Sequence, residues 1–215
     1  MPHFLDIEHW ERKDHYFFFK DFDDPFFTLC ANVDITQTLA YVKDHQSSFF
    51  LASLYLSTIA ANKIKEFKYR IREDKVIVHE RVHPSSTIFK KNKTFSFCYF
   101  EYNDTFSEFS QSAEEIIKSN QQDQAPLTSY REKDAVIYYT VIPWTRFTSL
   151  THPKQHVKKD SIPKIGFGKY YEANRRLQMP VSVQVNHALI DGFHISEFLN
   201  SFQELLNNPE KALAA

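Results

Sequence analysis

The chain has 215 residues, of which 42% are hydrophobic and 16% aromatic, so it can bury one sizeable core on its own. Its 26 basic and 27 acidic residues leave a formal net charge of −1. Such a balance provides no overall field to attract nucleic acid or an anionic membrane surface. We therefore expect a single domain over residues 1–215, with no nucleic-acid partner and no membrane partner.

The cysteine content and the N-terminal sequence indicate the cellular compartment of the protein. The two cysteines, Cys30 and Cys98, are too few for a disulfide framework or a metal knuckle. The N-terminal residues lack the basic and apolar regions of a signal peptide. The longest apolar stretch, residues 49–61, is interrupted by serines and a threonine and is too short to span a bilayer. These features predict a cytoplasmic protein.

Strand and helix patterns alternate along the chain. The predicted strands are residues 26–34, the two arms of a hairpin at 69–79, 87–89, 95–102, 135–142 and 181–186. The predicted helices are residues 36–45, 49–67, 106–120, and one that runs to residue 206 behind an N-cap at Asp191. Residues 121–133 are polar and contain proline, which predicts a surface loop.

The segment 181–194 changes from strand to turn to helix. Its valines alternate with polar residues, which predicts a strand with one buried face, and His187 falls in phase with the valines. Asp191 and Gly192 then end the strand. A histidine and an aspartate four residues apart at such a junction suit chemistry better than packing, so both are candidate site residues.

Two other interpretations of these residues are open from the sequence. A histidine on an apolar face is most often a core residue with a satisfied hydrogen bond. His187, Asp191 and His194 also carry donor atoms that zinc or iron accepts, but no fourth ligand or cysteine pair lies nearby. We therefore expect no metal.

Three motifs resemble one known family in their order and spacing. Residues 184–194, Gln-Val-Asn-His-Ala-Leu-Ile-Asp-Gly-Phe-His, resemble the His-x-x-x-Asp-Gly-Phe-His signature of the chloramphenicol acetyltransferase family. Residues 143–149 resemble its Pro-Trp-x-x-Phe-x-Ser segment, and residues 10–15 resemble its Trp-x-Arg-Lys-Glu-His segment. The resemblance covers nearly the whole chain. It implies an α/β fold, a two-layer sandwich of a mixed β-sheet with helices on one face.

The same resemblance implies an acyltransferase. Acetyl would pass directly from acetyl-CoA to a hydroxyl of a small, partly apolar acceptor, chloramphenicol or a similar compound. His187 is then the general base that removes the hydroxyl proton and later returns it to the CoA sulfur. Ser149 donates its hydroxyl to the oxyanion of the tetrahedral intermediate.

The resemblance also implies supporting residues. Asp191 pairs with Arg12 and holds the catalytic turn. Lys169 and Tyr170 hold the adenosine phosphate of coenzyme A, and a lysine suits a phosphate as a point charge. The implied acceptor-pocket residues are Phe18, Phe19, Phe27, Phe95 and Phe97.

Four positions depart from the family pattern. Asn186 stands where the family has a second histidine, and Ser48 stands where it has a lysine. Gly166 replaces a threonine, and Phe97 replaces a smaller pocket residue. These changes do not affect His187 and Ser149, to which the reaction is assigned. They leave open which acceptor is used and whether chloramphenicol is accepted.

All three glycines of the chain, at 166, 168 and 192, lie beside the candidate site. Glycine averages about 7% of residues in proteins. A chain this poor in glycine that places all three there predicts close approach of the backbone at these positions.

Aromatic runs at residues 16–19, 26–27, 49–50 and 95–100 predict self-association, because they supply more apolar surface than the helices of one sheet domain cover. The family resemblance implies a homotrimer with active sites between subunits.

Two other functions are open from the sequence. The chain could be the catalytic core of a dihydrolipoamide acyltransferase, which acts on a thiol and shares the short histidine motif. It could instead be a non-catalytic member that binds acyl-CoA or aromatic ligands.

Overall fold

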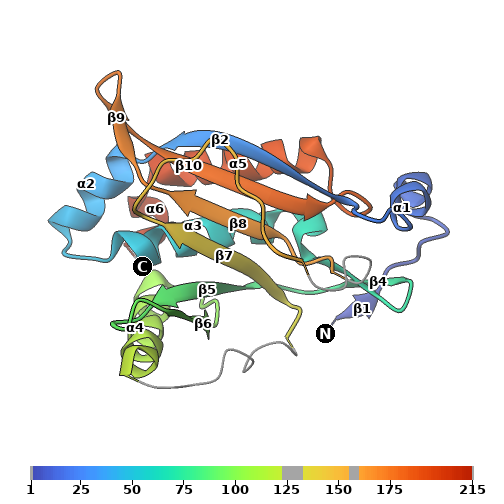
Figure 1. The fold of residues 1–215 in the computed structure, drawn as a ribbon, viewed down its shortest axis with the longest axis horizontal. Helices are drawn as coiled ribbons and strands as arrows, with labels where there is room; N and C mark the ends of the chain where they lie inside the picture. The colour runs from blue at the N-terminus through green and yellow to red at the C-terminus, as the bar shows by residue number, and fades with distance from the viewer. Residues whose placement is uncertain (1, 123–132, 155–159, 215) are drawn as a thin grey trace.

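The computed structural model describes residues 2–122, 133–154 and 160–214, and it contains a mixed sheet with helices packed against one face (Figure 1). The main sheet has the strand order β2-β10-β8-β7-β5-β6, and β9 pairs with the beginning of β10. Its strands are β2 Phe26–Asp34, β5 His83–Phe89, β6 Phe95–Tyr99, β7 Val136–Ile142, β8 Lys164–Gly168, β9 Tyr171–Ala173 and β10 Arg176–Asn186. β5 and β7 pair in parallel, as do β7 and β8, and the other pairs are antiparallel.

The helices are α1 Lys13–Phe19, α2 Thr36–Asp44, α3 Phe49–Lys63, α4 Phe106–Gln122, α5 Gly192–Asn207 and α6 Glu210–Leu213, with a 3-10 helix η1 Lys65–Lys68. Helices α2, α3, α4 and α5 each contact the main sheet and at least one other helix, and α6 contacts α4. A small sheet of β1 His3–Phe4, β4 Lys75–Val78 and β3 Tyr69–Arg72 lies with α1 at one end of the molecule (Figure 1). The predicted α/β class and layer arrangement are confirmed.

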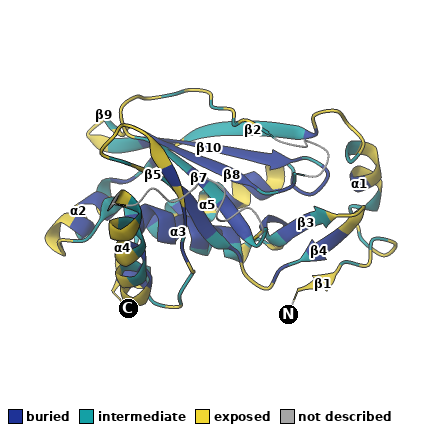
Figure 2. Ribbon diagram, turned by 60° about the horizontal axis from the view of Figure 1, so that its bottom comes forward, coloured by how far each residue is buried: buried dark blue, intermediate teal, exposed yellow. Residues whose placement is uncertain are grey.

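The core fills the space between the sheet and the helices. The valines of β10 are fully buried there, as are Phe198 and Phe202 of α5. Phe202 stacks on Phe167 of β8 with ring centroids 5.9 Å apart. Figure 2 shows the central strands in the colour of buried residues, whereas β1 and parts of β9, α1 and α4 are exposed.

The sheet face opposite the helices, hereafter the open face, is covered in part by residues 143–154 (Figure 1). The His152 backbone N–H donates to Oε1 of Gln184 (3.4 Å), and Gln184 donates to Oγ1 of Thr28 (3.1 Å). The prediction that β10 has only one buried face is therefore wrong, since Ser182, Gln184 and Asn186 are also buried. A covering loop, rather than a helix, buries these polar side chains.

The predicted helix 49–67 is too long. α3 ends at Lys63 because Ile64 takes an extended conformation (φ −100°, ψ 116°), and η1 follows. The predicted helix 106–120 continues to Gln122. Most of the predicted loop at residues 121–133 lies outside the described residues.

Two predicted strands have different limits. The strand predicted at 87–89 begins at His83, because His83 starts the parallel pairing with β7, and the strand predicted at 95–102 ends at Tyr99. The sequence did not predict β8, whose two glycines weaken the strand pattern. None of the helices in the described ranges combines the length and apolarity that a membrane span requires.

Candidate active site

The turn between β10 and α5 carries His187. The backbone N–H of His187 donates to the Pro25 carbonyl at 2.8 Å. Asp191 is the N-cap of α5, and its Oδ1 accepts a hydrogen bond from the backbone N–H of Phe193 (2.9 Å). The backbone N–H of Asp191 in turn donates to Nδ1 of His194 (3.1 Å). Hydrogen bonds therefore fix both ends of this turn.

The His187 imidazole lies between two aromatic rings. Phe19 of α1 stacks on it with centroids 4.1 Å apart and planes 12° apart, and Phe27 of β2 contacts it at 4.5 Å. Its Nδ1 is buried and has no hydrogen-bond partner among the described residues. The two aromatic contacts hold the imidazole in one orientation.

Arg12 and Asp191 form an ion pair between Nη1 and Oδ2. Burial by itself would raise the pKa of Asp191, but the contacts with His194 and Arg12 outweigh it, and the pKa lies below its usual value. Asp191 is therefore ionised at neutral pH and serves as both a cap and an anchor of the turn.

Glu66 of η1 extends this network. The buried Glu66 carboxylate lies 3.7 Å from Nε2 of His194, and Nδ1 of His194 lies 2.9 Å from Oδ1 of Asp191. The turn is thus connected to the segment before α1 through Arg12 and to the end of α3 through η1. No set of three histidine, cysteine or acidic side chains in the described ranges is arranged to hold a metal ion.

The predicted acceptor residues fall into two separated groups. Phe18, Phe19 and Phe27 lie near His187, whereas Phe95 and Phe97 lie on β6, the opposite edge strand of the sheet from β2. Strands are about 4.8 Å apart, so the five steps between β2 and β6 correspond to roughly 24 Å. One chain therefore does not bring these five side chains together.

Ser149 is also separated from His187. It is exposed in the covering segment, next to Leu150, whose side chain packs over Gly166 and Ser182. Ser182 lies five positions before His187 on an extended strand, which corresponds to roughly 16 Å. Within one chain the two predicted catalytic residues do not form a common site.

Lys169 and Tyr170 line a pocket of about 360 Å³ between α3 and the ends of β7 and β8. Phe49 of α3 meets Tyr170 edge-on, with ring centroids 6.0 Å apart. The other lining residues are Phe50, Ser53, Val141, Pro143, Phe167, Gly168 and Met179. The lining is largely apolar, with a cationic side chain and an exposed aromatic ring at its mouth.

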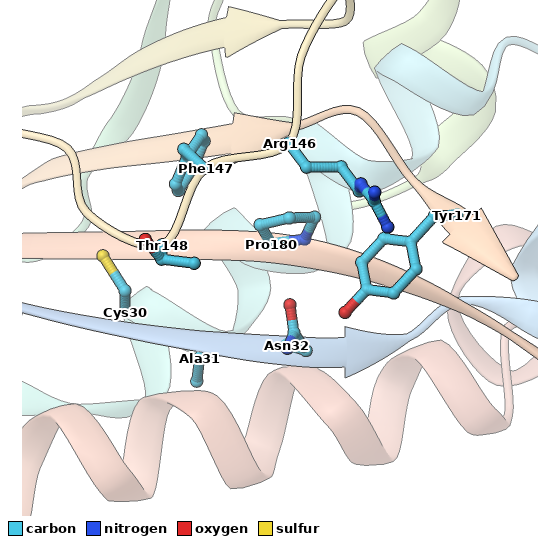
Figure 3. Close-up of a pocket in the computed structure, with 8 residues that line it drawn as sticks. All are labelled: Cys30, Ala31, Asn32, Arg146, Phe147, Thr148, Tyr171 and Pro180. Carbon is cyan, nitrogen blue, oxygen red and sulfur yellow. The ribbon is translucent and has the colours of Figure 1, made fainter. Parts of the chain in front are cut away.

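A second pocket of about 280 Å³ lies on the open face, beneath residues 146–148 (Figure 3). The Arg146 guanidinium stacks over the Tyr171 ring at 4.7 Å. Asn32, Thr148 and Cys30 complete its polar rim (Figure 3). Burial raises the pKa of the Cys30 thiol, which does not favour its use as a nucleophile.

Comparison with known proteins identifies the family. Residues 3–203 match the family model described as chloramphenicol acetyltransferase. This chain belongs to the chloramphenicol acetyltransferase family. It is 31% identical over 208 residues to a chloramphenicol acetyltransferase of Clostridium perfringens, covering 96% of this chain and 95% of the relative. It is 28% identical to chloramphenicol acetyltransferase 3 of Escherichia coli, covering 96% and 98% of the two chains.

Solved structures agree with this assignment. A chloramphenicol acetyltransferase superposes with a TM-score of 0.90 at 32% identity, covering 96% of this chain and 100% of that chain. The dihydrolipoamide acetyltransferase of Azotobacter vinelandii superposes with a TM-score of 0.69 at 14% identity, covering 92% and 87%, which indicates a shared fold only. The chain is therefore an acyltransferase of the chloramphenicol acetyltransferase family.

Three departures from the family pattern have local structural reasons. Ser48 is the N-cap of α3 and accepts a hydrogen bond from the backbone N–H of Leu51 (3.3 Å). Asn186 accepts from the Ala188 backbone N–H (3.0 Å) and donates to the Asp160 carbonyl (3.1 Å). A Cβ at Gly166 would clash with Leu150 and Ser182, so close approach is confirmed there.

The other two glycines differ in their surroundings. At Gly168 a Cβ would stand 2.9 Å from the Phe147 ring, so close approach is confirmed there too. Gly192 has open space around its Cβ position, so the prediction is wrong within one chain.

Two residues of the site region were not predicted from the sequence. Glu66 lies near the end of the predicted helix 49–67, and only the fold brings it to His194. Thr140 of β7 pairs with Gly166, so its half-buried side chain lies on the open face, where the Leu150 side chain occupies the space beside Gly166.

Proposed function

We propose that this chain transfers acetyl from acetyl-CoA to a hydroxyl of a small, partly apolar acceptor, chloramphenicol or a similar compound. The observation that carries the proposal is the imidazole of His187, held between Phe19 and Phe27 on a turn braced by Arg12 and Asp191. The names of the relatives support transfer of acetyl and the acceptor class.

The reaction follows from a histidine acting as general base. His187 removes the proton of the acceptor hydroxyl as its oxygen attacks the acetyl carbonyl carbon. The tetrahedral intermediate collapses with cleavage of the carbon–sulfur bond. The imidazolium then returns the proton to the departing sulfur, so the products are the acetyl ester and coenzyme A with a free thiol.

A hydroxyl is needed to stabilise the oxyanion of this intermediate. We assign this role to Ser149, and Thr140 is the competing candidate. Donors that stabilise a transition state are effective when they are fixed in advance, and Thr140 is half-buried on a strand whereas Ser149 is exposed in a loop. The two alternatives make different predictions, which are given in the Discussion.

The separation of site residues within one chain supports a site shared between subunits. One set of exposed aromatics surrounds the His187 turn: Phe17, Phe18, Phe22 and Phe193. A second set lies on the other half of the molecule: Phe89, Phe95, Phe97 and Trp144. Contact of the first set on one chain with the second set on another is heterologous, and such contacts form a ring when the rotation between subunits closes. We infer a homotrimer in which His187 of each chain lies against the open face of the neighbouring chain and completes the active site there.

Acetyl-CoA fits the pocket beside α3. Lys169 provides a positive charge for a phosphate, and the exposed Tyr170 ring provides a stacking surface for adenine.

Replacement of the base tests the proposal. His187→Ala should lose at least a hundredfold in kcat, because general base catalysis contributes roughly 10² to 10⁴. It should keep its circular dichroism spectrum and its affinity for coenzyme A. His45→Ala, which removes an exposed imidazole at the C-cap of α2, is the matched control and should retain activity. More than a tenth of wild-type kcat in His187→Ala would contradict the assigned role.

Two further acceptor assays separate the remaining alternatives. Release of thiol from acetyl-CoA that requires dihydrolipoamide, and not a hydroxyl acceptor, would indicate the acyltransferase core of a 2-oxoacid dehydrogenase complex. Binding of coenzyme A with no turnover on any acceptor would indicate a non-catalytic member.

A further inference from the structure

The covering segment 143–154 carries Ser149 across the open face and is hydrogen-bonded to the sheet on both sides of it. Before Ser149, the Thr145 carbonyl accepts from the backbone N–H of Lys169 (2.9 Å). After Ser149, the backbone N–H of His152 donates to a side chain of β10 (3.4 Å). Ser149 itself is exposed between these two points, so its position depends on what holds the residues next to it.

Two glycines of β8 leave sockets in the open face beneath this segment. A Cβ at Gly166 would overlap Cδ2 of Leu150, and a Cβ at Gly168 would stand 2.9 Å from the Phe147 ring. The two glycines are two positions apart on the strand and therefore share one face of the sheet. The side chains of Leu150 and Phe147 occupy the volumes that the glycines leave empty, one on each side of Ser149.

Leu150 is held over three neighbouring strands. Cys30, Ser182 and Gly166 are aligned across β2, β10 and β8. The Leu150 backbone hydrogen-bonds to the Cys30 thiol, while its side chain packs over Gly166 and the fully buried Ser182. Movement of Leu150 along the sheet would break these contacts together, so the residue next to Ser149 has one defined position.

We propose that Gly166 and Gly168 are positioning residues for the reaction: the sockets that they leave for Leu150 and Phe147 fix Ser149 in the place where it stabilises the oxyanion. The inference rests on the proposed role of Ser149. It explains how a serine in an exposed loop is fixed in advance, as an oxyanion donor must be.

A double-mutant cycle with Ser149 tests this role in the intact protein, with thiol release from acetyl-CoA measured on the best hydroxyl acceptor of a screen that includes chloramphenicol. Gly166→Ala should displace Leu150 and lower kcat about tenfold or more, because a misplacement of about 1 Å can cost roughly 10² in rate. In a Ser149→Ala background the same substitution should change kcat less than about twofold, because the hydroxyl that it misplaces is already absent. An equal loss in both backgrounds would show that Gly166 acts on some other group or on the fold as a whole and would overturn the inference.

Hydrogen exchange followed by mass spectrometry provides a readout that does not depend on turnover. The amides of residues 145–152 should exchange faster in Gly166→Ala than in the wild type, because the segment loses its contact with the sheet. If Gly166→Ala does not fold, Leu150→Ala empties the same socket from the other side and should give the same results in both experiments. Leu199→Ala, which removes a half-buried leucine of α5 on the other side of the sheet, is the control and should leave kcat and the exchange of this segment unchanged.

The possible failures are distinguishable. Unchanged exchange of residues 145–152 in the Gly166 and Leu150 variants would overturn this inference alone. Wild-type kcat in Ser149→Ala would overturn the assignment of the oxyanion donor and, with it, the positioning role. Absence of turnover by the wild type with every hydroxyl acceptor would overturn the proposed function, whatever the exchange rates.

Discussion

Arg12 and Asp191 form an ion pair that joins the segment before α1 to the turn after β10, 179 positions away in the sequence. Their side chains are 13% and 29% exposed, so the pair is shielded from much of the solvent. Phe19, which stacks on His187, belongs to the helix that begins directly after Arg12. One contact therefore fixes both the turn that carries the imidazole and the helix that carries its stacking partner.

Removal of either partner should destabilise the protein. Loss of one member of a fully buried pair costs about 3–5 kcal/mol, and the partial exposure here reduces the expected loss to about 1–3 kcal/mol for Arg12→Ala or Asp191→Ala. In urea denaturation the double variant should lose less than the sum of the single variants. Asp191→Asn, which keeps a capping side chain, separates the charge from the cap. Strict additivity would show that the two side chains do not interact in solution.

Acid should destabilise the protein through Asp134, which precedes β7. Its carboxylate accepts hydrogen bonds from Nε (2.6 Å) and Nη2 (2.5 Å) of Arg72, and Nε2 of His79 lies 3.1 Å from it. Burial tends to raise the pKa of Asp134, but the contacts with His79 and Arg72 prevail and hold it well below its ordinary value.

A carboxyl whose pKa is lower in the folded protein contributes stability above its unfolded pKa of about 3.9, and this contribution is lost as the pH falls further. The free energy of unfolding should therefore decline below about pH 4. The decline should be shallower in Asp134→Asn than in the wild type. Asp44→Asn, at the exposed end of α2, is the control and should follow the wild-type curve. If the free energy of unfolding declined equally at acid pH in all three proteins, the role of Asp134 would be contradicted.

The identity of the oxyanion donor can be decided by two variants. Loss of a hydroxyl that acts only in the transition state should lower kcat by about 10² or more and leave the Kd of coenzyme A unchanged. Ser149→Ala should show this loss if the loop serine is the donor. Thr140→Val, which keeps the shape of the side chain, should show it if the strand threonine is the donor. Activity above a tenth of wild type in both variants would exclude a hydroxyl donor at either position.

The sequence predicted the elements with strong periodicity, such as β10 and α5, and the motifs around His187 predicted the family. It did not predict β8, because two glycines and a lysine conceal the strand pattern that its pairing with β10 and β7 imposes. The contact of Glu66 with His194 depends on where η1 lies, and no local pattern encodes it.

The positions of the site residues relative to one another could not be predicted without the fold. Residues 10–19 and 187–194 meet at one end of the molecule, whereas Ser149, Phe95 and Phe97 lie over the sheet or at its far edge. A sequence gives the types of these residues, but only the strand order shows that one chain separates them.

The central claim is that the active site forms between the subunits of a trimer. Analytical ultracentrifugation of the wild type, combined with acetyl-CoA turnover assays over a dilution series, tests it most directly. We expect activity only in a species of about three times the 25.4 kDa chain mass, with specific activity falling as that species dissociates. A species of the single-chain mass that turns over acetyl-CoA at the full rate would show that each chain holds a complete site and would contradict the shared arrangement.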